Sequence, residues 1–161
     1  MPLPSHMTLE GTKQGKIDGS CDMQGREKTI LVEAMSHEVY IPRDTQSGLA
    51  TGKRVHQPLV VTKFYDKASP KLYQALCTGE HMKNVTLKWY RISAQGTEEH
   101  YFTHKLEDAI VVSVKAWMPN ALDKEKENYS HMEDVAFTYR KITWTWVIDG
   151  IEAQDSWATP K

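Results

Sequence analysis

Residues 84–106, NVTLKWYRISAQGTEEHYFTHKL, show the clearest alternation of apolar and polar side chains in the chain. Before the turn, one face carries Val85, Leu87 and Trp89, and the residues between them are polar or amphipathic. Such a period of two is typical of a β-strand with one buried face. Residues 93–96, SAQG, form a turn, and the chain then returns as a second strand. The stretch therefore predicts an antiparallel hairpin.

A helical pattern precedes this hairpin. Ser69 is a candidate N-cap, and Pro70 suits the first helical position because its missing N–H would be unpaired there. Leu72 and Leu76 have the four-residue spacing of one helical face, and Gly79 is a typical stop signal. These signals predict one helix of about ten residues.

Extended segments also follow the hairpin. An apolar row at alternate positions, which we expect to face inward, is closed by Pro119 and consists of Ile110, Val112, Val114, Ala116 and Met118. In the last segment the largest side chains change face between Tyr139 and Ile142. A bulge, or a strand that passes from one packed surface to another, would produce this change.

The N-terminal half contains two further strands and one long loop. Residues 28–34 and 37–41 are rich in β-branched and aromatic side chains, which predicts strands. Residues 43–54, RDTQSGLATGKR, include two glycines and almost nothing to bury, so we expect a long exposed loop. Residues 55–63 are again extended, and Pro58 favours an edge or a bulge there.

These elements make the chain mainly β, with about seven or eight strands and one short flanking helix. The connections are short, whereas each crossover of a parallel sheet needs about a dozen residues or more. We therefore expect an antiparallel two-sheet β-barrel or a two-sheet sandwich. The 161 residues suit a single domain, 1–161, with one hydrophobic core.

Composition excludes several functional classes. The chain has 20 Lys and Arg residues against 21 Asp and Glu residues, and this balance argues against nucleic-acid binding through bulk charge. No apolar run reaches about 18 residues, so no helical membrane span is predicted. The first residues lack the basic start and the apolar stretch of a cleavable secretory signal, and we expect no classical export.

Residues 48–53, GLATGK, invite comparison with a phosphate-binding loop but differ from it in two ways. Their glycines are separated by three residues instead of four, and Arg54 follows Lys53 where magnesium binding needs Ser or Thr. The segment also lies between strands and opens no helix. We therefore interpret it as part of a surface loop.

His100 and His104 have the spacing of a helical zinc site, with Glu99 beside the first. The surrounding pattern predicts a strand, on which the two side chains share a face but lie about 13 Å apart. We expect solvent-facing or subunit-contact histidines instead of metal ligands. Cys21 and Cys77 lack the spacing of a zinc cluster or a disulfide framework, and we interpret both as small hydrophobic residues in a reducing compartment.

No residue pattern supports catalysis. A nucleophilic enzyme would need a motif such as GxSxG or a cysteine with a recognisable signature, and the sequence contains neither. Aromatic and basic residues are interleaved at 88–91 and 139–144, as on single-strand-binding surfaces, but no basic stripe accompanies them. The five tryptophans suggest large buried interfaces, either within the fold or between copies of it.

Several longer stretches match one known family in its order and cover nearly the whole chain. They are YIPRDTQSG at 40–48, TGKRVH at 51–56, ASPKLYQA at 68–75, VTLKWYR at 85–91, YRKITW at 139–144 and DSW at 155–157. Through them the chain closely resembles the haemolysin-coregulated protein (Hcp) family, which forms the inner tube of type VI secretion systems. It departs from close relatives at His6 and Met7, where they tend to have an aromatic followed by an aliphatic residue.

This resemblance implies a β-barrel of two sheets with a flanking helix, similar to phage tail-tube proteins. It implies a homohexameric ring whose copies stack into a hollow tube that can hold small secreted effectors. The tube is assembled in the bacterial cytoplasm, expelled by a contractile sheath and capped by a spike (VgrG-like) protein. The resemblance implies no catalysis, no metal, no cofactor, no nucleic-acid binding and no membrane insertion.

The resemblance also indicates which residues act in assembly. In the family, an extended loop reaches towards the adjacent ring, and residues 43–54 correspond to it. The candidates for ring stacking are Asp44, Thr45, Gln46, Ser47, Lys53 and Arg54. Ser36 corresponds to a lumen-facing position of the family through the local match around residues 33–37.

Two hypotheses from other classes stay open at this point. A monomeric β-barrel that binds a small ligand would contain a cavity and would not assemble with rising concentration. A secreted enzyme on a β scaffold would need a convergent site with perturbed ionisation.

Overall fold

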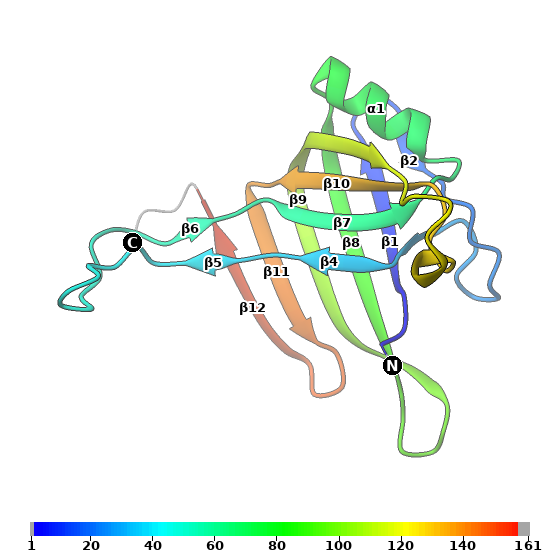
Figure 1. Cartoon of the computed structure of the whole chain (residues 1–161). Coiled ribbons are helices and arrows are strands. Elements are labelled where there is room, and N and C mark those ends of the chain that lie inside the picture. Colours follow the sequence, from blue (N-terminus) through cyan, green and yellow to red (C-terminus); the bar gives the residue numbers. More distant parts are fainter. Residues whose placement is uncertain (1, 158–161) are drawn as a thin grey trace.

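The structure is a computed structural model that describes residues 2–157, and in this part of the chain it is mainly β (Figure 1). The first strands are β1 (Ser5–Gly11), β2 (Gly15–Ile17), β3 (Ile30–Val32), β4 (Ala34–Ser36), β5 (Val39–Tyr40), β6 (Val55–His56) and β7 (Leu59–Phe64). They are followed by the helix α1 (Ser69–Thr78), β8 (His81–Ile92), β9 (Glu98–Trp117), the 3-10 helix η1 (Lys124–Lys126), β10 (Met132–Thr138), β11 (Lys141–Trp146) and β12 (Ile151–Ser156). The expectation of a mainly β chain with one short α-helix is confirmed.

Ten strands form one antiparallel sheet, with the order β2-β1-β8-β9-β10-β7-β4 along its main path. β11 pairs with β9 and β12, and β5 and β6 form a separate two-stranded sheet. The main sheet curls without closing its hydrogen bonds into a circle, because β3 pairs with β1 whereas β4, after Glu33, pairs with β7. Figure 1 shows two layers, with β7 and β10 crossing the direction of β1 and β8. The two-sheet fold class therefore holds, although the barrel is not fully closed.

The longest strand, β9, joins the two layers. Its second half pairs with β10 and its first half with β11, so β10 and β11 follow one path along it. Phe137 and Tyr139 are buried before the break between β10 and β11, and Ile142 is buried after it. The spacing of inward side chains thus changes from two residues to three. The predicted change of face between Tyr139 and Ile142 is confirmed.

A bulge in β9 corrects the predicted inward row. The register between β9 and β10 shifts between Ala136 and Phe137, which leaves Val112 as an extra residue. Val111 before the bulge is buried, and Val114 after it packs against the core. Val112 itself is 43% exposed. Of the predicted row, only Val114 packs against the core. The bulge puts Ile110 and Val112 out of the inward phase, and Ala116 and Met118, beyond Val114, are exposed.

The helix α1 has the predicted length and the predicted end. Gly79 follows its last residue in the left-handed conformation, with a φ of 68° that favours glycine. Its start differs from the prediction, because Ala68 and not Ser69 is the N-cap. Asp66 Oδ1 accepts a hydrogen bond from the Ala68 N–H at 3.0 Å. The Ser69 hydroxyl is instead part of a buried network.

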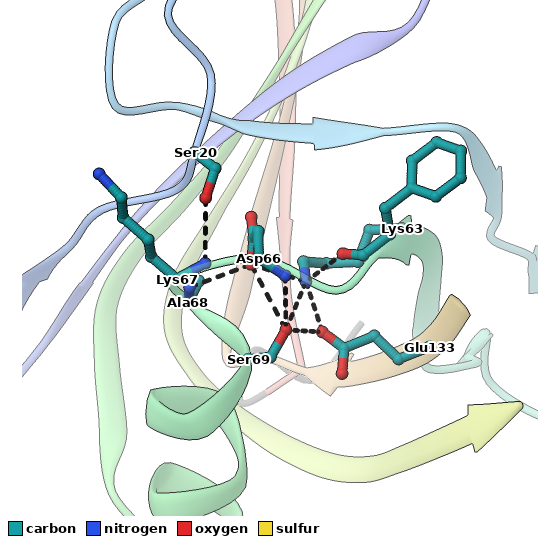
Figure 2. A network of polar contacts seen from close by, with 8 residues as sticks. Ser20, Lys63, Asp66, Lys67, Ala68, Ser69 and Glu133 are labelled. Atoms are coloured by element: carbon teal, nitrogen blue, oxygen red, sulfur yellow. Dashed lines mark hydrogen bonds and ion pairs between the residues drawn. The ribbon is translucent and has the colours of Figure 1, made fainter. Parts of the chain in front are cut away.

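A buried lysine joins the start of α1 to the sheet (Figure 2). The side chains of Lys63 on β7 and Glu133 on β10 are fully buried and form an ion pair. The Ser69 hydroxyl donates a hydrogen bond to Glu133 Oε1 at 2.6 Å. Lys63 Nζ also lies 2.9 Å from Asp66 Oδ1 and donates to the Phe64 carbonyl at 2.9 Å. Such hydrogen bonds offset the cost of burying charge, and here they fasten the helix start to two strands.

The hydrophobic core lies between the layers and under α1. Leu72 and Ala75 form the buried face of the helix. Beneath them the sheet contributes Met7, Leu9, Leu59, Val61, Val85, Leu87, Leu106, Val111, Val135 and Phe137. Trp89 packs against this core as a partly buried side chain, so the alternation that predicts the hairpin is confirmed.

Candidate functional site

The loop of residues 43–54 connects β5 with β6 and projects beyond them, away from α1 (Figure 1). Arg43 and Ala50 form an antiparallel bridge, and the Thr51 N–H donates to the Pro42 carbonyl at 2.8 Å. Every residue from 43 to 53 is exposed. The 43–54 loop is therefore exposed, as the sequence predicts. It is also held by hydrogen bonds within itself.

The tip of the 43–54 loop is a turn built on Asp44. The Asp44 carboxylate accepts hydrogen bonds from the Ser47 hydroxyl at 2.7 Å and from the Gln46 N–H at 3.1 Å. These bonds stabilise the charged form, so the pKa of Asp44 lies below its ordinary value, with the Ser47 hydroxyl as the largest cause. The Gly48 N–H closes the turn on the Asp44 carbonyl at 2.8 Å. Residues 44–47, four of the predicted stacking residues, thus form one ordered turn.

Arg54 lies apart from this turn, at the base of the loop. Its Nε donates to Asp155 Oδ2 at 2.5 Å and its Nη2 to Asp155 Oδ1 at 3.0 Å, which makes a bidentate pair with β12. Nη2 also donates to the Ser156 carbonyl at 2.8 Å. The Arg54 hydrogen bond is the largest cause that lowers the pKa of Asp155 to about 2. Lys53, the remaining predicted stacking residue, is exposed.

Asp155 also contacts a chain of aromatic side chains beneath the loop. His56 Nε2 lies 2.7 Å from Asp155 Oδ2, and His56 Nδ1 lies 2.7 Å from the Tyr139 hydroxyl. His37 Nε2 lies 2.7 Å from the same hydroxyl. The Trp157 ring covers His56, with a centroid distance of 5.5 Å. Burial lowers the pKa of His37 and raises the pKa of Tyr139. Segments far apart in the sequence therefore meet at the base of the loop.

Sequence reasoning missed four residues of this site: His37, His56, Tyr139 and Asp155. Two short motifs carried a signal for part of it, RVH at 54–56 and DSW at 155–157. In each motif the first and third residues fall on one face of an extended strand. Nothing in the sequence indicates that these two faces meet.

Ser36, the predicted lumen-facing residue, lies on β4 and outside the 43–54 loop. In the described part of the chain, β4 pairs only with β7, and Ser36 lies opposite Val60. Ser36 is exposed, whereas its neighbour Met35 packs against the core. Ser36 thus faces outward from its layer, and its orientation towards a lumen stays a prediction.

His100 and His104 lie on β9, as predicted, but on opposite faces. The register between β8 and β9 shifts between Trp89 and Tyr90, which leaves Tyr101 as an extra residue and reverses the alternation. On the inner face, Trp89 Nε1 donates to His104 Nδ1 at 2.8 Å. On the other face, the His100 ring lies 5.4 Å from the Tyr90 ring. The expectation of a shared face is therefore wrong, and His104 packs inside instead of facing solvent.

The two cysteines are separate free thiols. Cys21 is half-buried, whereas Cys77 on α1 is exposed, so the interpretation as a packed hydrophobic residue does not fit Cys77. Among the residues that the structure describes, no group of three or more His, Cys, Asp or Glu side chains could hold a metal ion. Within the same residues, no helix has the length and apolar character needed to cross a membrane.

Comparison with known proteins decides the family. The family model described as "Type VI secretion system effector, Hcp" matches residues 6–146. The chain belongs to the Hcp family. The "Major exported protein" of Pseudomonas aeruginosa is 48% identical over an alignment of 169 positions, which covers 99% of this chain and 98% of that protein.

Solved structures of Hcp proteins agree with this assignment. Hcp1 from the Escherichia coli EAEC 042 pathovar is 39% identical, with a TM-score of 0.86 over 96% of this chain and 99% of that one. The secreted protein Hcp3 from Pseudomonas aeruginosa is 43% identical, with a TM-score of 0.79 over the same shares of the two chains. The resemblance read from the sequence motifs is confirmed.

Membership in the Hcp family gives the coarse function. Hcp proteins are secreted structural proteins of the type VI secretion tube, which assembles by ring oligomerisation. The chain is therefore a tube protein that the type VI system secretes, and not an enzyme.

Proposed function

We propose that this Hcp chain assembles into hexameric rings, and that the rings stack into a hollow tube through the 43–54 loop. One feature carries the proposal: an exposed polar loop that is ordered at both its tip and its base. The Asp44 carboxylate fixes the tip, and the pair between Arg54 and Asp155 fixes the base. Ordering such a segment costs conformational entropy. In a solitary subunit, burial of the exposed loop offsets little of this cost. A loop that is already ordered loses less entropy on meeting the next ring.

The free edge of β12 supports a contact between neighbouring subunits in a ring. In the described part of the chain, β12 pairs only with β11, so its other side carries unpaired backbone N–H and C=O groups. Ile151 on β12 is 64% exposed, and Ile148 just before it is 47% exposed. A closed ring requires a heterologous contact, in which one face of each copy meets a different face of the next. The β12 edge offers one such face.

The proposed rings enclose a lumen that carries small secreted effectors, with Ser36 among its lining residues. Ser36 presents a small hydroxyl on the exposed face of β4. The net charge of -1 favours stacking, because like subunits with little net charge repel one another weakly. In this proposal the tube forms in the bacterial cytoplasm inside a contractile sheath, carries a spike (VgrG-like) protein at its end, and leaves the cell through the type VI system.

Gel filtration with light scattering, followed by negative-stain imaging, tests the ring. We expect particles with the mass of six chains and a central hole. Ile151→Asp places a charge on the free edge of β12, and we expect it to weaken subunit association at least about tenfold. Ile151→Val keeps the apolar edge and is expected to leave the rings unchanged.

A protein that remains monomeric at high concentration would contradict the proposed ring. A monomer that binds a small ligand in its interior would favour the alternative of a ligand-binding β-barrel. Rings that form equally well in Ile151→Asp would show that the β12 edge is not part of the subunit contact.

A further inference from the structure

The hydrogen bonds beneath the 43–54 loop fit one arrangement of hydrogens when both histidines are neutral. The Asp155 carboxylate only accepts, so His56 Nε2 carries the hydrogen that it donates to Asp155. His56 Nδ1 is then an acceptor, and the Tyr139 hydroxyl donates to it. The Tyr139 oxygen in turn accepts from His37 Nε2. Every hydrogen in the chain from His37 to Asp155 thus has one acceptor.

This row of hydrogen bonds can accept one additional proton without losing a bond, but not two. A proton taken up by His37 binds to its Nδ1 and leaves the hydrogen bonds between His37, Tyr139, His56 and Asp155 unchanged. A proton on His56 turns Nδ1 into a donor, and Tyr139 then donates to His37 in its other tautomer. When both histidines are charged, both donate to the Tyr139 oxygen, and the Tyr139 hydroxyl hydrogen loses its acceptor. Tyr139 is only 5% exposed, and a buried polar hydrogen without a partner is costly.

The surrounding charges oppose the second proton. His37 faces Tyr139, His56 and His104, and burial followed by repulsion from His56 lowers its pKa. His56 faces Tyr139 and His37, and it shares the Asp155 carboxylate with Arg54. Because burial and repulsion hold the pKa of His37 below its ordinary value of 6.5, the doubly charged state forms only in acid.

The chain of hydrogen bonds holds the base of the 43–54 loop. His56 is the last residue of β6 and pairs with Val39 of β5, and the next amide, of Gln57, donates to the Glu38 carbonyl at 2.9 Å. Through Tyr139, this two-stranded base is tied to the break between β10 and β11. Loss of that tie would leave the base attached mainly through Arg54, Asp155 and its own short sheet.

We propose that His37, Tyr139 and His56 form a proton-sensitive clamp that positions the base of the 43–54 loop. The clamp is closed when at most one histidine is charged, and it opens when both are. Its expected consequence, weaker ring stacking in acid, rests on the proposed function of the loop. The clamp itself rests only on the contacts within one chain.

Hydrogen–deuterium exchange of the assembled protein tests the clamp directly. Exchange rates of amides 54–57, corrected for the intrinsic effect of pH, are compared between pH 7.5 and pH 4.5 and referred to core amides of β8. We expect wild-type protection to fall about tenfold or more, since this segment would open locally. In His37→Gln the side-chain amide can donate to Tyr139 but takes up no proton, so its protection should not change with pH.

His81→Gln is the matched control. His81 is exposed, contacts Asp108 on another part of the surface, and should leave the wild-type pH dependence intact. Wild-type protection that stays constant to pH 4.5, or a His37→Gln protein that loses protection as wild type does, overturns the clamp. If His37→Gln does not fold, Tyr139→Phe removes the shared oxygen. In that variant, amides 54–57 are expected to be poorly protected from exchange already at pH 7.5. Protection equal to that of wild type would equally overturn the clamp.

Tube length, imaged at the same two pH values, separates the clamp from the proposed function of the loop. Tubes that shorten in acid together with the loss of protection support both. If the wild-type loop loses protection in acid but the tubes keep their length, the clamp is supported and the stacking role of the 43–54 loop is overturned.

Discussion

His104 is the residue whose ionisation bears most clearly on stability. It accepts a hydrogen bond from Trp89, and burial, with a smaller effect of nearby His37, lowers its pKa to about 4. The unfolded chain takes up this proton near pH 6.5, whereas the folded chain does not. The stability from neutral His104 is therefore complete above pH 6.5 and is lost as the pH falls towards 4. This loss amounts to about 3 kcal/mol.

The variant His104→Gln tests this assignment. Its amide oxygen can accept the Trp89 hydrogen bond, but it does not titrate, so we expect the fall in unfolding free energy between pH 7 and pH 4.5 to shrink by about 2 to 3 kcal/mol. Urea unfolding at fixed protein concentration measures the difference. The exposed His81→Gln should keep the wild-type pH slope, and a His104→Gln protein with that same slope would contradict the prediction.

Single residues were predictable where the signal is local. Trp89 lies on the same inward face of its strand as Val85, and the alternation of the sequence alone places it against the core. The contact between His56 and Tyr139 joins residues 83 positions apart, and no local pattern indicates it. The sequence therefore locates the 43–54 loop and Arg54 at its base, but not Asp155, His56, Tyr139 and His37, which hold that base.

At the level of elements, the buried pair of Lys63 and Glu133 fixes α1 to β7 and β10 (Figure 2). Lys63→Met leaves the Glu133 carboxylate buried without its cation. We expect the free energy of unfolding to fall by about 3 to 5 kcal/mol, because an uncompensated buried charge is strongly unfavourable. Urea unfolding measures this loss.

Lys67→Met is the matched control, since Lys67 is an exposed lysine of the same connection, and we expect a change of at most about 0.5 kcal/mol. The double variant Lys63→Met with Glu133→Leu removes both charges and should regain most of the lost stability. Wild-type stability in Lys63→Met alone would show that the pair does not hold the helix.

The elements also show where sequence patterns stop being sufficient. Pro70 and Gly79 mark the ends of α1 because their backbone preferences act locally, and the predicted length is correct. The sequence indicates two separate extended segments where the structure has the single strand β9. The alternation breaks at three places within this strand: at the extra residues Tyr101 and Val112, and at Asp108, which adopts a positive φ of 50°. The two bulges depend on the pairing of β9 with β8 and β10, and no residue type in the sequence marks them.

For the whole molecule, the proposed role of the 43–54 loop predicts a change in tubes without a change in rings. Asp44→Ala removes the carboxylate that orders the tip, so we expect the ring–ring dissociation constant to rise about tenfold. Deletion of residues 44–53 should abolish stacking. Electron microscopy of tube length, with light scattering for the mass of the ring, measures both effects.

Asp123→Ala provides a control of the same chemistry at another site. The Asp123 carboxylate accepts the Glu125 N–H at 3.0 Å at the start of η1, and its loss should affect neither rings nor tubes. Normal polymerisation of the variant that lacks residues 44–53 would exclude the loop as the stacking element.

The family could be inferred from the sequence alone, because its motifs recur in order from residues 40 to 157. The general β architecture followed from alternation and short connections. The incomplete closure of the main sheet did not, since it depends on a change of pairing partner at Glu33 that no residue type marks.

The unequal burial of the two thiols has a practical consequence for following assembly. A maleimide dye should react first with Cys77, which is exposed on α1, and slowly with half-buried Cys21. Because α1 lies away from the 43–54 loop in Figure 1, a fluorophore there would leave that loop unmodified. The natural chain thus offers one preferred labelling position, and energy transfer between differently labelled subunits could report polymerisation in real time.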